Sequence, residues 1–183
     1  MERKHGPYTI KGSECRYRDD FVEFRVDEVV RPNGESGRYA TMRMLPGVAV
    51  LAVDDEGVAY LVRQFRYAVG KESVEVVQGA VDEGEEAPAA ARRELKEELG
   101  IEAEELTDLG PLDAVTSQVF SPSRLFLARG LTFTKHEREP TERLQPLKLP
   151  LAEAVRMVMD GRITQATTSV LILKAARLLA GEN

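Results

Sequence analysis

The sequence predicts an α/β fold, an α/β/α sandwich around a mixed β-sheet, with a small β subdomain at the N-terminus. Three observations support this prediction. Residues 22–27 and 40–44 alternate between apolar and polar side chains as half-buried strands do, residues 48–53 form an unbroken apolar run, and helical segments follow later in the chain. We expect the N-terminal β subdomain to comprise residues 1–45 and the main domain to comprise residues 46–183.

Composition and charge are those of an ordinary globular chain and argue against several classes of protein. Of the 183 residues, 43% are hydrophobic and 31% are charged. No run of about eighteen apolar residues could span a bilayer. The formal net charge of −6 argues against broad binding to nucleic acid or to an anionic membrane. The N-terminus shows no targeting peptide and the one cysteine, Cys15, cannot form an internal disulfide, so we expect a cytoplasmic protein.

The N-terminal subdomain is expected to contain an antiparallel hairpin. Its two strands are the alternating runs, and the Pro-Asn-Gly sequence at residues 32–34 favours a turn between them. A Pro-Gly pair at residues 46–47 then separates the subdomain from the apolar run. Because every residue from 48 to 53 is apolar, we expect that strand to be central and covered on both faces.

Two arginines lie where the next strand is expected to end. Residues 54–57 form a predicted turn and residues 58–62 a predicted strand, and Arg63 and Arg66 follow it. Guanidinium groups bind phosphate well, so both arginines are candidates for contact with a phosphorylated substrate. The alternative is that they are ordinary exposed arginines at a strand end.

The second half of the chain adds short strands and two helices. Further strands are expected at residues 74–77, 114–120 and 125–128, and helices at residues 150–160 and at about 165–179. The polar loop at residues 134–143 contains three glutamates. Its length and charge indicate a functional loop.

The most informative stretch runs from residue 79 to residue 101, an acidic loop followed by a helix. Pro88 suits the first turn of that helix and Gly100 suits its end. Helical spacing gathers apolar residues 87, 91, 95 and 99 in one stripe, and it gathers Glu94, Glu97 and Glu98 in the neighbouring sector. Like charges at this spacing repel by about 0.2–0.5 kcal/mol, so we expect a cation there. Carboxylate oxygens suit hard divalent cations, Mg²⁺ above all.

Two further residues are expected to support the acidic cluster. Arg93 lies one turn before Glu97 and could hold its carboxylate, and Glu85, just before the helix, could accept a hydrogen bond behind the metal ligands. The alternative is a solvated acidic helix, which glutamate-rich chains often form. The fixed spacing of the whole stretch argues against that alternative.

The same stretch resembles the signature of the Nudix hydrolase family at each defined position. Gly79 is followed by five residues and Glu85, then by seven residues and the run Arg-Glu-Leu-Lys-Glu-Glu-Leu-Gly-Ile at residues 93–101. The strand-rich N-terminal segment, residues 61–67 and Glu75 further resemble the ADP-ribose pyrophosphatase branch, which also cleaves other nucleoside-diphosphate sugars. The resemblance implies a Nudix-like sandwich and a homodimer formed through the N-terminal strands. It also implies a Mg²⁺-dependent enzyme, with Mn²⁺ as a substitute, that releases a nucleoside monophosphate and a sugar phosphate.

The resemblance implies a metal site on the helix. Its ligands are three side chains and one backbone carbonyl, those of Glu94, Glu97, Glu98 and Gln78. Glu85 and Gly79 are expected to support these ligands.

The resemblance further implies which residues contact the substrate. Arg66 is expected to hold the diphosphate, with Arg63 as a further candidate. A glutamate in the polar loop is expected to act as catalytic base, Glu142 as first choice and Glu139 as second. Glu98 and Arg93 complete the expected catalytic set.

Several substrates and one other function stay open. Val77 stands where this branch usually has proline, and Thr116 and Ser117 occupy a zone in which a proline often follows the signature. The linked sugar is therefore not fixed, and free nucleoside di- or triphosphates are an alternative substrate class. A non-catalytic nucleotide-sensing module is an alternative function, although the intact acidic set favours an enzyme.

Overall fold

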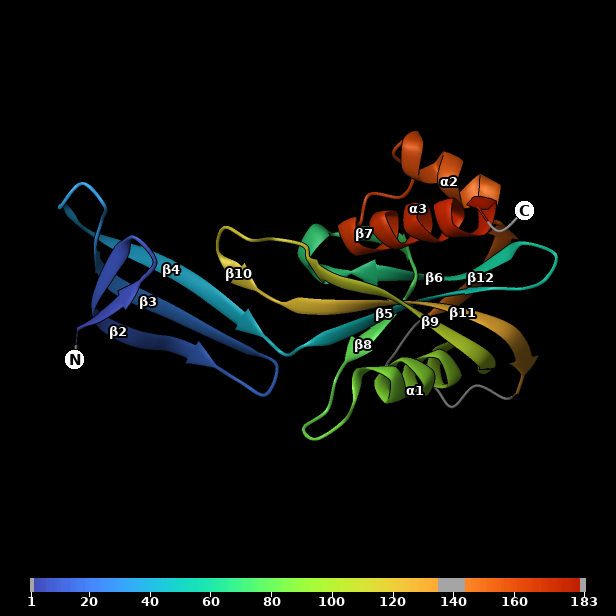
Figure 1. The fold of residues 1–183 in the computed structure, drawn as a ribbon, viewed down its shortest axis with the longest axis horizontal. Coiled ribbons are helices and arrows are strands. Elements are labelled where there is room, and N and C mark those ends of the chain that lie inside the picture. Colours follow the sequence, from blue (N-terminus) through green and yellow to red (C-terminus); the bar gives the residue numbers. More distant parts are fainter. Residues whose placement is uncertain (1, 135–143, 182–183) are drawn as a thin grey trace. The chain divides into compact units, whose positions relative to one another are not determined.

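The structure of the chain, a computed structural model, describes residues 2–134 and 144–181 (Figure 1). These residues form two compact units. The first unit comprises Met1–Pro46 together with Asp113–Pro122, and the second comprises Gly47–Leu112 together with Ser123–Asn183. Each unit has its own β-sheet.

The first unit is a sheet of five strands in the order β1-β2-β3-β4-β10. The strands are β1 (Arg3–His5), β2 (Tyr8–Arg18), β3 (Val22–Val30), β4 (Ser36–Met44) and β10 (Val119–Phe120). Strands β3 and β4 pair antiparallel, with Val26 opposite Ala40 and Phe24 opposite Met42, which confirms the expected hairpin. Strand β10 joins the other edge of β4 in parallel.

The prediction of a strand at residues 114–120 is wrong for most of these residues. Only Val119 and Phe120 form a strand, and residues 116–118 form a turn instead. Thr116 and Ser117 favour turns because their hydroxyl groups compete for backbone hydrogen bonds. The turn is fixed to β4, where the hydroxyl of Tyr39 donates to the carbonyl oxygen of Ser117 at 2.9 Å.

The first unit buries little apolar surface. Among its described residues, only Ile10 and Val29 are buried apolar side chains. Large apolar side chains are exposed on it instead, namely Tyr17, Phe21, Tyr39, Met42, Met44, Leu45, Val115 and Phe120. A sheet of this kind gains little stability from its own core.

The second unit contains a mixed sheet of seven strands, with β12, β6, β5, β11 and β9 in that order. The strands are β5 (Gly47–Val53), β6 (Val58–Arg66), β7 (Lys71–Glu75), β8 (Val77–Ala80), β9 (Ile101–Asp113), β11 (Pro122–Phe133) and β12 (Gln145–Pro150). Strand β5 is parallel to β11 and antiparallel to β6 and β8, while β7 pairs with the end of β6. A short 3₁₀ turn, η1 (Tyr67–Val69), connects β6 to β7. The mixed sheet agrees with the predicted fold class.

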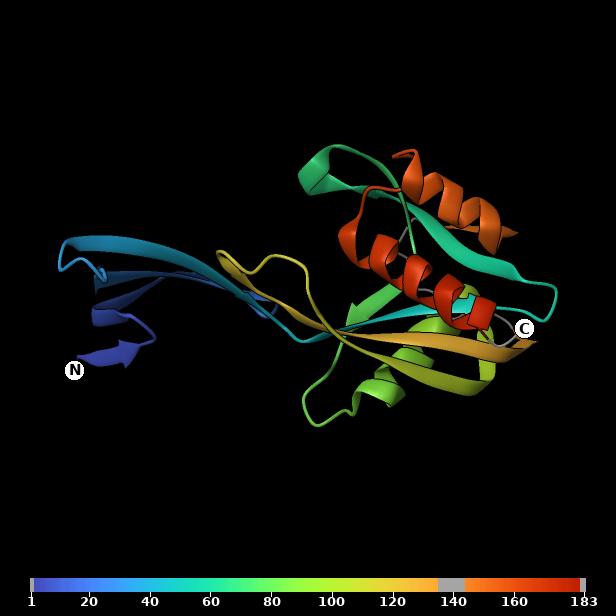
Figure 2. The ribbon, with the colours of Figure 1, turned by 45° about the horizontal axis from the view of Figure 1, so that its top comes forward.

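Helices cover both faces of this sheet (Figures 1 and 2). Helix α1 (Ala87–Leu99) packs on one face, and α2 (Leu151–Met159) and α3 (Ala166–Gly181) pack on the other. Strand β5 separates the two apolar layers by simple alternation. Residues 48, 50 and 52 pack in the layer of α1, and residues 49, 51 and 53 pack in the layer of α2 and α3. Each of these six residues is at most 2% exposed, so the predicted central strand and α/β/α sandwich are confirmed.

The two C-terminal helices lie where the sequence predicts them. Helix α2 begins directly after Pro150, and α3 begins after Gln165, whose carbonyl oxygen accepts the N–H of Ser169 at 3.0 Å. No helix in the described part of the chain is long and apolar enough to cross a membrane.

Candidate active site

The site is organised by helix α1 and by the way its ends are fixed. Pro88 lies in the first turn, and Gly100 adopts the left-handed conformation, with φ of 64°, that terminates the helix. The buried face consists of Ala90, Ala91, Leu95 and Glu98. This face is rotated slightly from the expected apolar stripe, because residues 87 and 99 are only partly buried. The rotation brings Glu98 into the protein, where the residue is 6% exposed.

Glu94 points toward strand β8. Residue 79 lies in β8, which pairs antiparallel with β5. A β-carbon on Gly79 would lie 1.9 Å from both Cδ and Oε1 of Glu94, so the carboxylate rests directly against the backbone of Gly79. The Glu94 side chain is 14% exposed, whereas that of Glu97 is 41% exposed.

Arg93 joins the acidic loop to the helix. Its Nε and Nη2 donate to the two carboxylate oxygens of Glu85 at 3.1 and 3.0 Å, and Nη2 also donates to the carbonyl oxygen of Ala80 at 3.0 Å. Its Nη1 donates to Glu94 at 2.8 Å and to Glu97 at 3.2 Å. The hydrogen bond from Arg93 holds the pKa of the Glu85 carboxyl below its usual value, and Glu85 in turn raises the pKa of Arg93.

The helix offers the donor atoms that a hard divalent cation prefers. Glu94, Glu97 and Glu98 provide carboxylate oxygens, and Gly79 leaves room for one of these groups beside the strand. In the part of the chain that the structure describes, no three acidic, histidine or cysteine side chains converge closely enough to hold a metal as they stand. Because Glu94 and Glu97 both bond to Arg93, a cation bound by them would compete with that guanidinium for their oxygens. The type of donor atom fits a divalent metal, while the positions of these side chains in this structure are those of a cluster paired with Arg93.

Arg66 is held in a bidentate ion pair at the end of β6. Its Nε lies 3.1 and 3.2 Å from the two carboxylate oxygens of Glu75, and its Nη2 lies 2.5 Å from Oε2. Glu75 is 1% exposed, while the Arg66 side chain is 42% exposed. The buried carboxylate therefore fixes an arginine whose outer part reaches solvent.

The two candidate arginines are not brought together. Side chains alternate along a strand, so Arg63 and Arg66, three residues apart on β6, start from opposite faces of the sheet. Arg63 is exposed. The predicted catalytic bases, Glu139 and Glu142, lie outside the described residues.

A chain of polar side chains behind Glu75 was not predicted from the sequence. Gln78 donates to Glu75, and Gln165 donates to Gln78. Gln165 precedes helix α3, but glutamine is not a preferred N-cap residue, so its position alone gave no signal.

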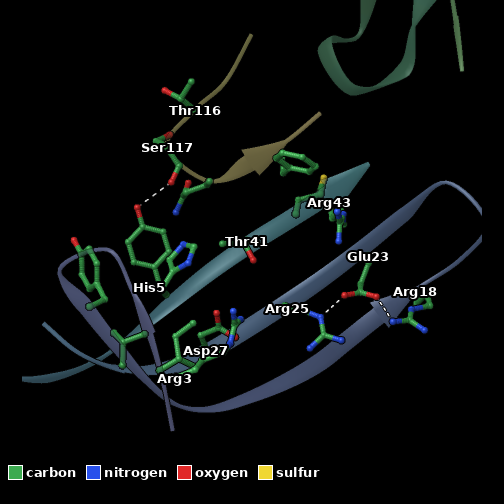
Figure 3. Close-up of a pocket in the computed structure, with 17 residues that line it drawn as sticks. Arg3, His5, Arg18, Glu23, Arg25, Asp27, Thr41, Arg43, Thr116 and Ser117 are labelled. Atoms are coloured by element: carbon green, nitrogen blue, oxygen red, sulfur yellow. Dashed lines mark hydrogen bonds and ion pairs between the residues drawn. The ribbon is translucent and has the colours of Figure 1, made fainter. Parts of the chain in front are cut away.

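A separate hollow of about 760 Å³ lies within the first unit (Figure 3). The sheet and the turn at residues 116–118 line it, and Arg18 and Arg25 both bond to Glu23 beside it. Arg43 stacks over the ring of Phe120, with 5.1 Å between Cζ and the ring centre. The hollow contains none of the predicted site residues.

The fold and the acidic helix agree with a comparison against known families. The model of the NUDIX domain matches residues 43–160, so the chain belongs to the NUDIX domain family. An ADP-ribose pyrophosphatase of Bacillus subtilis is 32% identical over 155 residues, which cover 82% of this chain and 83% of that protein. A methanol dehydrogenase activator of Bacillus methanolicus is 30% identical over 168 residues, covering 90% and 89% of the two chains.

A solved structure gives the same result for the fold. The crystal structure of an ADP compounds hydrolase superposes with a TM-score of 0.84 and 25% sequence identity, covering 99% of this chain and 98% of that one. The predicted family, fold class and enzyme class, a Nudix pyrophosphohydrolase, are therefore confirmed.

Proposed function

We propose that this enzyme hydrolyses the diphosphate linkage of ADP-ribose or of another nucleoside-diphosphate sugar. The products are a nucleoside monophosphate and a sugar phosphate. The observation that carries the proposal is the acidic helix α1, which Arg93 ties to the loop at Glu85 and whose Glu94 rests against Gly79. The names of the Bacillus subtilis relative and of the solved structure, an ADP-ribose pyrophosphatase and an ADP compounds hydrolase, support this substrate class.

The chain offers a defined set of groups for divalent cations, for which Mg²⁺ is the proposed ion and Mn²⁺ a substitute. These groups are the carboxylates of Glu94, Glu97 and Glu98 and the backbone carbonyl of Gln78. When bound, the cations supply neutralisation of the diphosphate charge and a lower pKa for the attacking water. The ion pair of Arg93 with Glu85 fixes the acidic loop against the helix, and Arg93 also holds the carboxylate of Glu97.

The remaining roles fall to residues that contact the substrate. Arg66 binds the diphosphate through the exposed part of its guanidinium while Glu75 holds the other part. Arg63 starts from the opposite face and is the weaker candidate. Glu142, or Glu139 as second choice, accepts a proton from water as the water oxygen bonds to one phosphorus. The bond from that phosphorus to the bridging oxygen breaks, and the bridging oxygen leaves with the other phosphate.

We also propose that the first unit forms a homodimer contact. Its sheet buries only two apolar side chains among its described residues and exposes Met42, Met44 and Phe120, which a second copy of the chain could cover. The proposed dimerisation element is therefore the predicted segment of residues 1–45, to which strand β10 adds Phe120. Size-exclusion chromatography with light scattering should give twice the mass of the chain. The cytoplasmic location stays a prediction from the single cysteine, Cys15.

One assay tests the substrate class. The wild-type enzyme is incubated with ADP-ribose, other nucleoside-diphosphate sugars and free nucleotides, with Mg²⁺ or with a chelator, and products are separated by ion-exchange chromatography. We expect a nucleoside monophosphate and a sugar phosphate, only with metal present. Phosphate release from free nucleotides alone would indicate the alternative substrate class. Binding without any product would indicate a nucleotide-sensing module.

A further inference from the structure

A continuous chain of hydrogen bonds links the start of helix α3 to Arg66. The backbone N–H of Thr168 donates to Oε1 of Gln165 at 2.6 Å, and Nε2 of Gln165 donates to Oε1 of Gln78 at 3.2 Å. Nε2 of Gln78 then donates to Oε2 of Glu75 at 3.0 Å, and that oxygen also accepts from Arg66. The chain connects residues that are up to 102 positions apart in the sequence, from 66 to 168.

The direction of every bond in this chain is determined. A backbone N–H can only donate, so the side-chain oxygen of Gln165 must face Thr168 and its NH₂ group must face Gln78. Gln78 must therefore accept with its oxygen, which turns its own NH₂ group toward Glu75. A carboxylate paired with arginine can only accept. The orientation of the Gln165 amide, fixed at the helix terminus, therefore determines that Gln78 donates to Glu75, the carboxylate that holds Arg66.

The first member of the chain also has a structural role that can be separated from the rest. The carbonyl oxygen of Gln165 accepts the first N–H bond of α3 and its side chain accepts from the third helical residue, so it is the N-cap of the helix. A second contact fixes the same terminus, because the hydroxyl of the fully buried Thr168 accepts the N–H of Val76 at 3.2 Å. The helix terminus therefore stays anchored when the link to Gln78 is lost.

We propose that Gln165 and Gln78 are positioning residues for the substrate, acting through Glu75 to orient Arg66. This proposal rests on the proposed function, in which Arg66 binds the diphosphate. Glu75 accepts hydrogen bonds from both Arg66 and Gln78, and it is buried away from water that could replace either donor. Loss of the bond from Gln78 removes one of the side chains that fix the carboxylate, so Glu75 and the Arg66 paired with it can shift together.

The substitution Gln165→Glu separates the two roles of Gln165. A glutamate keeps an oxygen for the N–H of Thr168, and a negative charge at a helix N-terminus is favourable, so the cap is retained. It cannot donate to Gln78. Gln78 can then keep its orientation, with its oxygen facing the carboxylate introduced at position 165, or rotate its amide so that the oxygen faces Glu75. Both arrangements weaken the bond between Gln78 and Glu75. The control Ala166→Glu adds the same charge to the same helix terminus at an exposed position outside the chain of bonds.

The first readout needs no substrate. Solvent exchange of the Arg66 Nε proton is measured by ¹⁵N NMR, and the resonance is assigned by its loss in Arg66→Lys. We expect Gln165→Glu to speed this exchange about threefold to tenfold, the range that one hydrogen bond supports, while Ala166→Glu leaves it unchanged. The melting temperatures of both variants should stay within about 3 °C of wild type. Unchanged exchange in Gln165→Glu overturns the proposal.

The second readout uses turnover of ADP-ribose. We expect Gln165→Glu to raise KM by about threefold to tenfold with a smaller change in kcat, because Arg66 binds substrate and transition state alike. Ala166→Glu should keep the wild-type KM, and an equal rise in both variants would assign the effect to charge and overturn the proposal. If wild-type enzyme hydrolyses no diphosphate, the proposed function fails, and the exchange of the Arg66 proton still decides whether the chain of bonds positions Arg66.

Discussion

Glu94 and Gly79 approach so closely that no side chain fits between them. A β-carbon on residue 79 would lie 1.9 Å from Cδ of Glu94 and 2.5 Å from its Cγ. Strand β8 and helix α1 meet at this point. The glycine that opens the acidic stretch is therefore required by packing, because it makes space for a carboxylate beside the strand.

We expect Gly79→Ala to reduce activity strongly and stability only modestly. The Glu94 side chain can rotate away from the added methyl group, which limits the loss in unfolding free energy to about 1–2 kcal/mol. The rotation displaces a proposed metal ligand, so kcat/KM should fall by about tenfold or more. The control Gly12→Ala places a β-carbon 3.6 Å from its nearest neighbour, Oε2 of Glu28, and should change neither quantity. A fully active Gly79→Ala enzyme would contradict the proposed role of Glu94.

The substitution Glu98→Gln tests the metal site. It keeps the shape of a buried side chain while removing the charge, so we expect kcat/KM to fall by about 100-fold or more with the fold retained. Steady-state kinetics and circular dichroism measure the two effects. Glu105→Gln, at an exposed position of β9, makes the same chemical change away from the site and should behave as wild type. Equal activity of the two variants would show that Glu98 does not hold the cation.

Arg93→Lys tests the link between the acidic loop and the helix. Lysine keeps the charge but cannot bridge Glu85, Glu94 and the carbonyl of Ala80 at once. We expect a loss of about 1–3 kcal/mol in unfolding free energy, measured by urea denaturation, and a fall in activity. Arg92→Lys is the matched control on the same helix, because Arg92 is exposed and donates to one carbonyl, that of Ala103. Comparable losses in both variants would argue against a special role for Arg93.

The ion pair of Glu85 with Arg93 predicts a dependence of stability on pH. Arg93 lowers the pKa of Glu85 in the folded protein, so the pair contributes fully above the ordinary pKa and loses its contribution as pH falls through the folded value. We therefore expect wild type to exceed Glu85→Gln in unfolding free energy near neutral pH. The difference should shrink below about pH 4.3, the ordinary pKa of a glutamate. Urea denaturation across this range measures it, and a constant difference would mean that the pair does not stabilise the fold.

Much of the fold follows from local patterns in the sequence. The acidic helix was predictable because its start, its end and its charged sector all depend on spacing within one segment, from Pro88 to Gly100. Strand β5 was predictable because a strand covered on both faces must be apolar throughout. Strands β2 and β9 were not expected, since both carry many charged residues and most of their side chains are exposed. Such strands are specified by their partners rather than by their own composition.

The site was predictable only where its residues are close in sequence. The contact of Arg93 with Glu97 could be inferred from helical spacing, because the two residues lie one turn apart in the same helix. The bonds from Arg93 to Glu85 and Glu94 were not predicted, since Glu85 lies before the helix and Glu94 is the next residue in the chain. The bond between Gln78 and Gln165 joins residues 87 positions apart. Its existence depends on how helix α3 docks on the sheet, which no local pattern encodes.

The alternation along β5 has a consequence for how the protein tolerates genetic change. One backbone carries the residues of both apolar layers, odd-numbered toward α2 and α3 and even-numbered toward α1. Inserting or deleting a single codon within this strand would move the side chains on one side of the change from one apolar layer to the other. A substitution alters only one of the two layers. We therefore expect random mutagenesis to recover functional β5 sequences with changed side chains, but none whose length differs by one residue.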